Sequence, residues 1–375
     1  MRHLVIVRTG ANVLDLKTYN CQELGLAKAL VRKGLKVSLV MAGYKKRKET
    51  YPCDEGVVDV YFLRFKSIDQ RYGFFIGISD ALSILKPDLI QVHDLGIFMT
   101  WYVTRWAKRN KVPCYLIQGA YQISPRKGVR QIEYIYYSLF AKDTLRNVSG
   151  IGCKTKMASR FIKHFLNCAT NMTCIGLDES KFKEPIVKDW RKELAVGEKK
   201  ILLYVGVMEN RRRPHFLFDV AKSLPDDYVM IFVGNGPQWD DLKKRIEIER
   251  LQQKVYLLGK LGQEQLPSLY KCADLFLLAS EYEIYGMVIL EAMYYGVPVV
   301  SSYTAGSETI IDKNEDGVIV DEFDVNKWSN TICCLCEDNS RLTEMKKKAQ
   351  KKILDEYVWD KAVDHFLDLY KSDIK

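Results

Sequence analysis

Short apolar runs alternate with helical patterns along the first half of the chain. The apolar runs lie at residues 3–8, 37–41, 57–63, 88–93, 113–117, 148–152 and 172–176. Between the first two runs, residues 21–33 carry apolar side chains at helical spacing, and Gly34 ends that pattern. Residues 96–110 and 129–146 have the same helical character. This alternation of strand and helix predicts a parallel sheet covered by helices.

A second series of the same kind follows a polar stretch at residues 183–200, which is typical of a linker. Its predicted strands are residues 201–205, 229–233, 255–258, 275–278, 297–301 and 318–320, and its predicted helices include 216–224, 239–250, 264–271 and 287–295. A last helix is expected from about Trp359 to Tyr370. The whole pattern predicts an α/β protein with two doubly wound, Rossmann-like domains, in which ligands bind at the carboxyl ends of the strands.

Length and composition agree with this division. A chain of 375 residues suggests two domains of roughly 150–200 residues each. No apolar run approaches the roughly 18 residues needed to span a bilayer, and residues 1–8 resemble a buried strand more than a signal peptide. We therefore expect a cytoplasmic protein.

The ten cysteines of the chain are scattered, which favours reduced, buried thiols. A zinc or redox role for the Cys333–Cys336 pair is the alternative.

The charge is unevenly distributed. The chain has a formal net charge of +10, but residues 1–190 contain 31 Lys and Arg against 16 Asp and Glu, so the remainder is net acidic. This asymmetry predicts an acidic partner for the first half in particular. Nucleic acid, anionic lipid and a phosphorylated acceptor all have the required charge.

Two glutamates, Glu283 and Glu291, bracket a glycine turn and the start of an apolar helix. Gly286 lets the backbone approach a ligand closely, and the amides of Met287 and Val288 at the helix N-terminus suit an anion such as a diphosphate. Glu291, one turn further along, can accept hydrogen bonds from ribose hydroxyls, and Glu283 can hold other hydroxyls. The pattern predicts a nucleotide-sugar site. Two solvated glutamates on an amphipathic helix are the alternative.

The E-x7-E spacing, continued as E-A-M-x-x-G-x-P-V-V over residues 291–300, resembles the family 4 retaining glycosyltransferases of the bacterial surface-polysaccharide type. The resemblance covers nearly the whole chain and is strongest from 201 to 308. It implies the GT-B fold, in which two Rossmann-like domains face each other across a cleft. The acceptor-side domain would occupy residues 1–185 and the donor domain residues 195–355, with a helix at 356–375 crossing back to the first domain.

The basic turn after the strand 201–205 departs from this family in one respect. After Gly206 the family carries an arginine, where this chain has Val207, and Arg212 stands where the family has a lysine. We expect Arg212 to bind the donor diphosphate together with the 286–288 amides, because a guanidinium group can bind phosphate with two hydrogen bonds. A neighbouring arginine, Arg211 or Arg213, can supply the charge that Val207 lacks; a solvated basic turn is the alternative.

Other positions follow the family more loosely. The resemblance places Glu308 near the donor sugar, with helix capping as the alternative role. Gln118 stands where the family often has a histidine close to the donor's 6-hydroxyl, and it can hydrogen bond there but cannot take a proton. His93 is either a cleft ligand or a strand-end residue bonded to backbone. The Gly234-Asn235-Gly236-Pro237 turn matches a family turn whose role looks structural.

Basic residues with interleaved aromatics form three clusters in the first half. They are Arg105, Trp106, Lys108, Arg109 and Lys111; Arg126, Lys127, Arg130, Tyr134, Tyr136, Tyr137 and Phe140; and residues 44–48. We interpret them as a surface for the anionic inner leaflet of the cell membrane, where a lipid-linked acceptor is presented. Solvated helix faces over a buried aromatic core are the alternative.

The sequence therefore predicts a retaining glycosyltransferase, cytoplasmic or peripheral on the inner face of the membrane. It would move a sugar from a UDP-sugar or GDP-sugar to a hydroxyl of a lipid-linked saccharide in cell-surface polysaccharide synthesis. Because the chain lacks a D-x-D pair, no metal and no cofactor are expected.

The candidate catalytic residues are Glu283, Arg212 and Gln118. The candidate donor-binding residues are Glu291, Arg212, Gly286, Met287, Val288, Gly206 and Glu308. A GT-B epimerase or phosphorylase is one alternative, and a non-catalytic nucleotide-sugar or nucleic-acid binder is the other.

Overall fold

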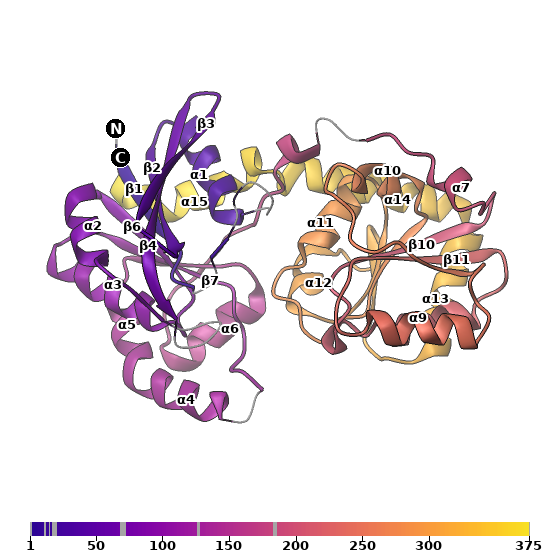
Figure 1. Cartoon of the computed structure of the whole chain (residues 1–375). Coiled ribbons are helices and arrows are strands. Elements are labelled where there is room, and N and C mark those ends of the chain that lie inside the picture. Colours follow the sequence, from indigo (N-terminus) through magenta and orange to yellow (C-terminus); the bar gives the residue numbers. More distant parts are fainter. Residues whose placement is uncertain are drawn as a thin grey trace. The chain divides into compact units, whose positions relative to one another are not determined.

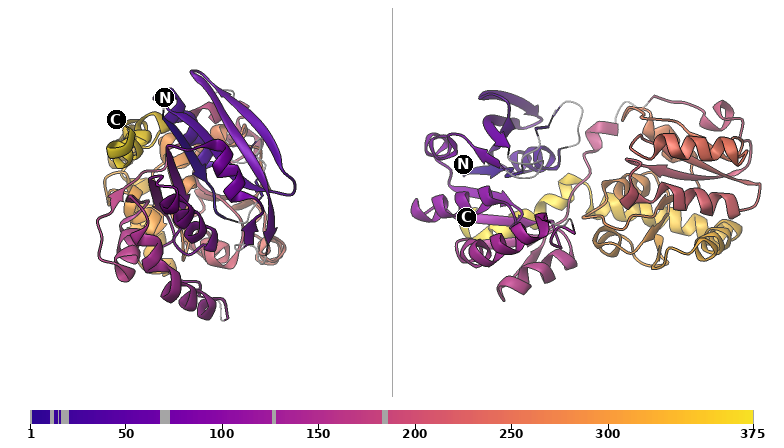
Figure 2. Two further views of the ribbon diagram at one scale, coloured as in Figure 1. Left: turned by 90° about the vertical axis from the view of Figure 1, so that its left-hand side faces the viewer. Right: turned by 60° about the horizontal axis from the view of Figure 1, so that its bottom comes forward.

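The computed structural model describes residues 2–10, 13–14, 16, 21–67, 73–125, 128–182 and 186–374. It divides into two compact units, shown in Figure 1. Unit 1 comprises Met1–Gly176 and Trp359–Lys375, and unit 2 comprises Leu177–Val358. Both ends of the chain thus belong to unit 1 (Figure 2). No helix in the described part of the chain is long and apolar enough to cross a membrane.

Unit 1 is built on a mostly parallel sheet in the order β3-β4-β2-β1-β6-β7-β8-β9. Its strands are β1 (His3–Val7), β2 (Lys36–Gly43), β3 (Arg47–Cys53), β4 (Gly56–Ser67), β5 (Gly73–Phe75), β6 (Leu89–His93), β7 (Cys114–Gln118), β8 (Gly150–Cys153) and β9 (Asn171–Met172). The pairings of β3 and β5 with β4 are antiparallel, and the others are parallel. All predicted strands are present, but β3 and β5 were missed. β3 is a half-exposed edge strand with Pro52 and several charges, so it lacks an apolar run.

Helices cover this sheet. They are α1 (Gln22–Arg32), α2 (Ile78–Leu85), α3 (Phe98–Arg109), α4 (Val129–Tyr136), α5 (Lys142–Arg146), α6 (Lys156–Phe165) and α15 (Trp359–Ile374). The helix expected at 129–146 is interrupted by a π-helical turn, η1 (Tyr137–Ala141), between α4 and α5. Leu4, Ile6, Val92 and Leu116 are fully buried in the sheet, as expected for strands covered on both faces.

The C-terminal helix α15 is an integral part of unit 1. The indole of Trp359 packs so closely on α1 that a Cβ atom at Gly25 would lie 2.1 Å from its Nε1 atom. Arg32 pairs with Asp360 at 2.6 Å. Further along α15, the buried hydroxyl of Tyr370 donates to Gln91 Oε1 in β6. The last helix therefore closes one face of the first sheet.

Unit 2 contains a fully parallel sheet in the order β12-β11-β10-β13-β14-β15. Its strands are β10 (Lys200–Val205), β11 (Tyr228–Val233), β12 (Val255–Leu257), β13 (Leu275–Leu278), β14 (Val299–Ser302) and β15 (Gly317–Val320). Its helices are α7 (Trp190–Glu193), α8 (Pro214–Ser223), α9 (Trp239–Ile248), α10 (Leu266–Cys272), α11 (Met287–Tyr294), α12 (Ala305–Ile310), α13 (Val325–Glu337) and α14 (Asn339–Glu356), with short 3₁₀ turns η2 (Glu179–Phe182) and η3 (Asn210–Arg212). The predicted α/β class with two doubly wound units is confirmed.

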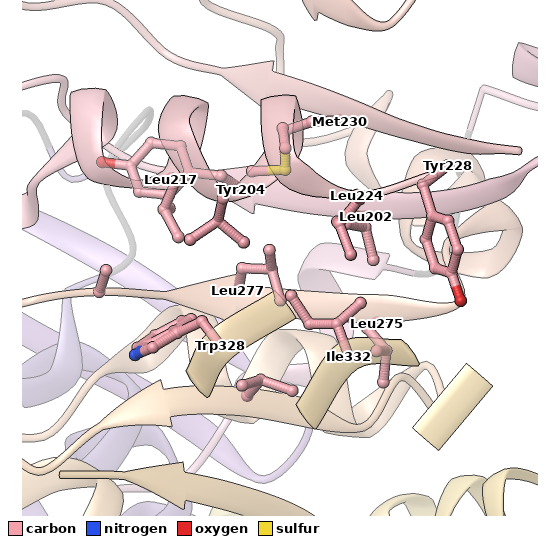
Figure 3. Packing of buried hydrophobic residues seen from close by; sticks show 14 of the residues in the cluster. Leu202, Tyr204, Leu217, Leu224, Tyr228, Met230, Leu275, Leu277, Trp328 and Ile332 are labelled. Carbon is pink, nitrogen blue, oxygen red and sulfur yellow. The ribbon is translucent and has the colours of Figure 1, made fainter. Parts of the chain in front are cut away.

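The core of unit 2 lies between the strands and the helices on one face (Figure 3). Leu202 and Tyr204 of β10 point into the layer that holds Trp328 and Ile332 of α13. Leu217 of α8 completes this part of the cluster. Because the near-continuous apolar strands are covered by helices, they hold the loops at their carboxyl ends in fixed positions.

The polar stretch 183–200 was expected as a linker, but residues 186–200 belong to unit 2. Residues 183–185 lie outside the described part of the chain. Trp190 is buried and donates to Ser268 Oγ at 3.0 Å. Arg191 donates to the carbonyl oxygens of Gly197 and Lys199. A few specific contacts thus fold a segment whose composition looks like that of a linker. The boundaries between the two units lie between Gly176 and Leu177 and between Val358 and Trp359.

Candidate active site

Three loops of unit 2 meet at the carboxyl ends of β10, β13 and β14. The loop after β13 carries Glu283, and its carbonyl oxygen accepts a hydrogen bond from Gly306 N at 3.3 Å. A Cβ atom at Gly306 would lie 2.2 Å from the carbonyl oxygen of Tyr285, so only glycine fits there without a shift. The loops after β13 and β14 are therefore packed backbone to backbone.

The loop after β10 is held in the same way by the G-x-G turn after β11. A Cβ atom at Gly234, which has a φ of +128°, would lie 1.9 Å from Gly206 O. A Cβ atom at Gly236 would lie 2.4 Å from Met208 O. The turn Gly234–Pro237 therefore has a structural role, as its sequence suggested: it supports the backbone at Gly206.

Arg212 projects from η3 back towards Gly206. Its Nη2 atom lies 3.4 Å from Glu283 Oε2, and its Nε atom lies 3.7 Å from Glu209 Oε1. The side chain is only 13% exposed, and among the described residues neither Nε nor Nη1 has a hydrogen-bond partner. Buried donors without acceptors cost on the order of 1–3 kcal/mol each, so this guanidinium group would gain from an added anion.

The neighbouring arginines are differently engaged. Arg211 donates to Tyr282 O at 2.7 Å and lies 2.8 Å from Glu209 Oε1. Arg213 pairs with Glu281 at 2.6 Å and lies over the ring of Phe323 at 4.0 Å. Arg213 thus has its own carboxylate and aromatic partners, whereas Arg211 shares Glu209 and Glu283 with Arg212. Val207, where the family has an arginine, is 52% exposed.

The N-terminus of α11 opens beside Glu283. Gly286 has a φ of +84° and precedes the helix, and no side chain caps its first turn. A Cβ atom at Gly286 would lie 3.4 Å from Glu283 Cγ and 2.9 Å from Ile289 Cδ1. The first amides of the helix, at Met287 and Val288, are therefore uncapped by side chains, and such amides favour an anion.

Glu291 lies inside α11 and is not a solvated surface residue. It is 6% exposed, and Tyr270 donates to its Oε2 atom at 3.1 Å. Burial raises the pKa of this carboxyl to about 7, and the hydrogen bond from Tyr270 only partly offsets that effect. Together with the ion-paired Glu283, this rules out the alternative of two solvated glutamates.

Glu308 lies in the first turn of α12 and is half-buried. Thr304 caps that helix by accepting a hydrogen bond from Ser307 N, and the Ser307 hydroxyl accepts one from Thr304 N in return. The capping role considered for Glu308 is therefore taken by other residues. Its predicted place near the donor sugar stays a prediction.

Gln118, in unit 1, is fully buried at the end of β7. Its Oε1 atom accepts a hydrogen bond from Leu95 N at 2.8 Å, and its Nε2 atom donates to Ala120 O at 2.6 Å. Asp94 completes the connection by accepting hydrogen bonds from the amides of Gly119 and Ala120. These contacts tie the loops after β6 and β7 together, so Gln118 has a structural function here, and its proposed catalytic role stays a prediction.

A polar cluster at the carboxyl ends of β1, β6 and β8 was not predicted as a group. Arg8, Glu23, His93 and Lys154 line a cavity of about 190 Å³ in unit 1. Arg8 Nε lies 3.7 Å and His93 Nδ1 3.9 Å from Glu23 Oε1. These residues come from distant parts of the sequence, so only the strand order brings them together; the strand-end position of His93 was the one available signal.

The protonation of this cluster follows from its neighbours. Tyr370 donates to Gln91 Oε1, so the Gln91 amide nitrogen, 2.9 Å from His93 Nε2, is the donor in that contact and Nδ1 carries the histidine proton. Burial lowers the pKa of His93. Burial alone would raise the pKa of Glu23, but the facing groups of His93, Arg8 and Lys154 lower it. A neutral imidazole therefore presents its N–H to a carboxylate near neutral pH.

All ten cysteines are free thiols, but the expected burial holds for only four of them, Cys21, Cys114, Cys153 and Cys336. Within the described ranges, no group of three or more His, Cys, Asp or Glu side chains is arranged to hold a metal ion.

The fold and this arrangement define the class of the protein. Residues 187–352, most of unit 2, match the family model described as glycosyl transferases group 1. The structure of Anabaena Alr3699/HepE in complex with UDP superimposes with a TM-score of 0.75 over 99% of this chain and 100% of that one, at 17% identity, which shows the shared fold. The chain is a glycosyltransferase of the GT-B fold.

Curated relatives give more specific comparisons. The UDP-Gal:alpha-D-GlcNAc-diphosphoundecaprenol alpha-1,3-galactosyltransferase of Escherichia coli is 27% identical over 309 residues, which cover 79% of this chain and 78% of that enzyme. The D-inositol 3-phosphate glycosyltransferase of Corynebacterium kroppenstedtii is 28% identical over 196 residues. That match covers 49% of this chain and 43% of the relative.

Proposed function

We propose that the protein transfers a sugar from a UDP-sugar to a hydroxyl of a lipid-linked saccharide. The observation that carries the proposal is the combination of Arg212, whose Nε and Nη1 atoms are buried without hydrogen-bond partners among the described residues, and the N-terminus of α11, which Gly286 leaves without a side-chain cap. Arg212 pairs with Glu283, in the loop that leads into α11. A diphosphate suits both elements. The names of the Escherichia coli relative, with its UDP-Gal donor and diphosphoundecaprenol acceptor, and the UDP complex of HepE support the choice of substrates.

In this proposal each site residue has one task. Arg212 and the amides of Met287 and Val288 bind the diphosphate, and Glu291 accepts hydrogen bonds from the ribose. Glu283, which pairs with Arg211 and Arg212, holds the donor sugar when the diphosphate takes over the arginine contacts. Glu308 and Gln118 keep their predicted roles as hypotheses.

The proposed chemistry retains the configuration of the anomeric carbon and needs no metal. The bond from that carbon to the diphosphate oxygen breaks, and the bond to the acceptor oxygen forms on the same face. The acceptor proton passes to the leaving diphosphate. Arg212 and the positive end of α11 stabilise the charge that develops on the leaving group.

We also propose that the polar cavity of unit 1 binds the acceptor saccharide. Its Glu23 carboxylate faces Arg8 and His93 and stays ionised near neutral pH, so it suits hydrogen bonding to a sugar hydroxyl better than proton abstraction. Lys154, held by Gln22 Oε1 at 3.1 Å, adds a donor at the same edge of the sheet.

Membrane docking by unit 1 is the third part of the proposal. On α4 and η1 the aliphatic residues Ile132, Ile135 and Leu139 are 67%, 62% and 65% exposed and follow helical spacing. An exposed aliphatic stripe on a strongly basic half of the chain suits the interface of an anionic bilayer.

Two of the aromatic residues expected at this surface pack inward, whereas Tyr134 is 48% exposed and has Arg130 over its ring. Tyr137 is buried, and the half-buried Phe140 packs on Trp101 with ring centroids 4.7 Å apart. Arg126 and Lys127 lie outside the described residues. The aliphatic stripe and the exposed Tyr134 are the candidate membrane contacts.

The donor site is tested by thermal unfolding with UDP, GDP, CDP and ADP, first in EDTA and then with Mg²⁺. UDP should raise the melting temperature selectively, and equally without and with metal, because a ligand stabilises the fold that it binds. Arg212→Ala should lose roughly 1.5–3 kcal/mol of UDP binding, the range of a charge-assisted hydrogen bond. Arg213→Ala is the matched control, since Arg213 has its own partners. Failure of every nucleotide to stabilise the wild type would refute the donor site.

Docking is tested by co-sedimentation with vesicles. Wild-type protein should bind anionic vesicles and be released as salt rises, because exposed charges are screened beyond a Debye length of about 8–10 Å near physiological ionic strength. The triple variant Ile132→Glu, Ile135→Glu, Leu139→Glu should lose this binding, whereas Ile248→Glu, at an equally exposed position of α9 in unit 2, should not. Equal binding of the triple variant would exclude the stripe.

A further inference from the structure

A second cavity in unit 1 shares no lining residue with the polar cavity of that unit. It has a volume of about 580 Å³, within the range of about 300–1,000 Å³ typical of small-molecule sites. It runs along α3 and is closed by β5 and the start of α2, and α2 and α3 are labelled in Figure 1. None of the residues assigned above to the donor, the acceptor or the aliphatic stripe lines it.

The walls of this cavity are apolar and mostly aromatic. They include Phe74 and Phe75 of β5 and Phe98, Trp101, Tyr102 and Trp106 of α3. Phe74 and Tyr102 are 42% and 39% exposed, although aromatic surface in contact with water is unfavourable. A hydrocarbon ligand would remove that surface from water.

The aromatic rings of the wall are held by contacts within unit 1. Phe98 packs edge-on against Phe74, with ring centroids 5.3 Å apart, and against Trp101 at 5.1 Å. A hydrogen bond holds the orientation of the Trp101 ring, because its Nε1 atom donates to Asp143 Oδ2 at 2.7 Å. A preformed wall costs little ordering entropy when a ligand binds.

The charges on this cavity are confined to one end. Among the described residues that line it, the charged ones are Arg105 and Arg109, in the last two turns of α3. Arg105 lies over the Trp101 ring at 5.3 Å and donates to Asp143 at 3.2 Å. Arg109 is exposed, and no acidic side chain of the described chain pairs with it. The cavity therefore offers an apolar body and a cationic end, which complements a lipid phosphate.

The position of the cationic end decides which lipid fits. α3 starts just after β6, at the carboxyl edge of the sheet, and Arg109 lies shortly before β7 begins at Cys114, at the amino edge. A phosphate bound there would be at the opposite edge from Glu23 and His93. The reacting acceptor would need its phosphates near the acceptor cavity, so its lipid carrier does not match this geometry.

We propose that this cavity binds one anionic phospholipid of the membrane, with an acyl chain along the aromatic wall and the headgroup phosphate at Arg105 and Arg109. The inference rests on the docking step of the proposed function and makes it specific. A single lipid held in this way would anchor unit 1 on the bilayer while leaving the carboxyl edge of the sheet free for the acceptor.

The test uses the full chain with short-chain lipids below their critical micelle concentration, so that no bilayer is present. Dihexanoyl phosphatidylglycerol should change the tryptophan fluorescence, because Trp101 and Trp106 line the cavity, and Trp101→Phe should diminish the change. Dihexanoyl phosphatidylcholine keeps the phosphate but adds a choline cation, which the two arginines repel, so it should bind about tenfold more weakly.

Matched variants locate the binding. Arg109→Glu should weaken phosphatidylglycerol binding about tenfold or more, whereas Arg146→Glu, an equally exposed arginine on α5 outside the cavity, should not. Both positions are at the surface, so both variants should keep the wild-type melting temperature. Equal loss in the two variants, or no difference between the two lipids, would overturn the proposal.

Two further results separate this inference from the function on which it rests. Tighter binding of farnesyl phosphate than of phosphatidylglycerol would assign the cavity to the polyprenyl carrier and overturn the phospholipid. Vesicle binding that persists while the short-chain lipid fails to bind would refute the cavity but leave docking by the aliphatic stripe intact. Failure of UDP to stabilise the protein would bear only on the donor site.

Discussion

Glu283 and Glu291 belong to one sequence motif, yet their surroundings differ sharply. Glu283 lies against two guanidinium groups, whereas Glu291 is buried in α11 with Tyr270 as its hydrogen-bond donor. Buried carboxylates without a cation are costly, because desolvation disfavours their charge. A site that needs Glu291 ionised to accept hydrogen bonds from a ribose must therefore tolerate that cost.

The cost of ionising the buried Glu291 carboxyl predicts that the stability of the protein depends on pH. The folded pKa of Glu291, about 7, is above the usual value of 4.5, so between these values the folded state binds a proton that the unfolded state has released. The contribution of Glu291 to the free energy of unfolding is therefore largest below pH 4.5. It falls by roughly 3 kcal/mol in all as the pH rises to 7. Glu291→Gln should remove this fall and be more stable than wild type at pH 8, yet bind UDP more weakly.

Urea unfolding of both proteins from pH 5 to pH 8 measures the first effect, and UDP titration at pH 8 measures the second. Parallel stability curves for the two proteins would contradict the burial argument. Unchanged UDP affinity would remove Glu291 from the ribose site.

The positions of some residues were predictable where a pattern is local. The helix start at Gly286, the place of Glu291 one turn further along and the position of Arg212 near Gly206 follow from short motifs in the sequence. The ion pairs of Glu283 with the arginines and the structural bonds of Gln118 could not be predicted, because they join segments from different strands. The Glu23–His93 cluster was missed for the same reason.

At the level of elements, glycines allow the loops of the site to pack closely on one another. Gly234, Gly236 and Gly306 each leave room for a backbone atom of a neighbouring loop. The loops after β10 and β11 therefore pack backbone to backbone, and so do the loops after β13 and β14. The sequence identifies these turns by their glycines. It does not show which loop each glycine faces, since that depends on strand order.

Gly234→Ala should therefore destabilise unit 2 by on the order of 2–3 kcal/mol, because the new Cβ would overlap Gly206 O in a strained backbone conformation. Gly197→Ala is the matched control: its φ is +55°, but nothing lies within 4 Å of the new atom. That change should cost about 1 kcal/mol. Differential scanning calorimetry of both variants makes the comparison, and equal losses would mean that backbone strain alone determines the effect.

Element prediction failed where the apolar signal was weak or local geometry intervened. The edge strand β3 alternates half-buried and exposed positions and carries several charges, so it resembles a loop. The helix at 129–146 has a continuous helical pattern, but η1 adds a residue to one turn and separates α4 from α5. The exposed aliphatic stripe lies across that junction.

For the whole molecule, the last helix completes the first unit. Removal of α15 would expose the pocket for Trp359 on α1 and leave Gln91 in β6 without its Tyr370 partner. A chain ending at Val358 should therefore lose most of the stability of unit 1, whereas unit 2 should keep its own transition and its UDP-induced shift. Two-transition calorimetry with and without UDP would measure this, and an unchanged unit 1 transition would show that α15 is dispensable.

The two α/β units and their parallel sheets were predictable, because strand and helix patterns are regular in both halves. The position of the boundary was not. Composition placed a linker at 183–200, whereas Trp190 and Arg191 attach much of that segment to unit 2. The contacts of two side chains thus fold a segment whose polar composition is typical of a linker.

The pairing of Leu177 with Val358 brings the two ends of unit 2 together, with Leu177 N donating to Tyr357 O at 2.6 Å. Unit 2 is thus inserted between Gly176 and Trp359 of unit 1. During synthesis the ribosome makes all of unit 2 before it makes α15, the helix that completes unit 1. The unit that is synthesised first is then the last to mature, and its unfinished helix face is the surface that a chaperone would meet on the nascent chain.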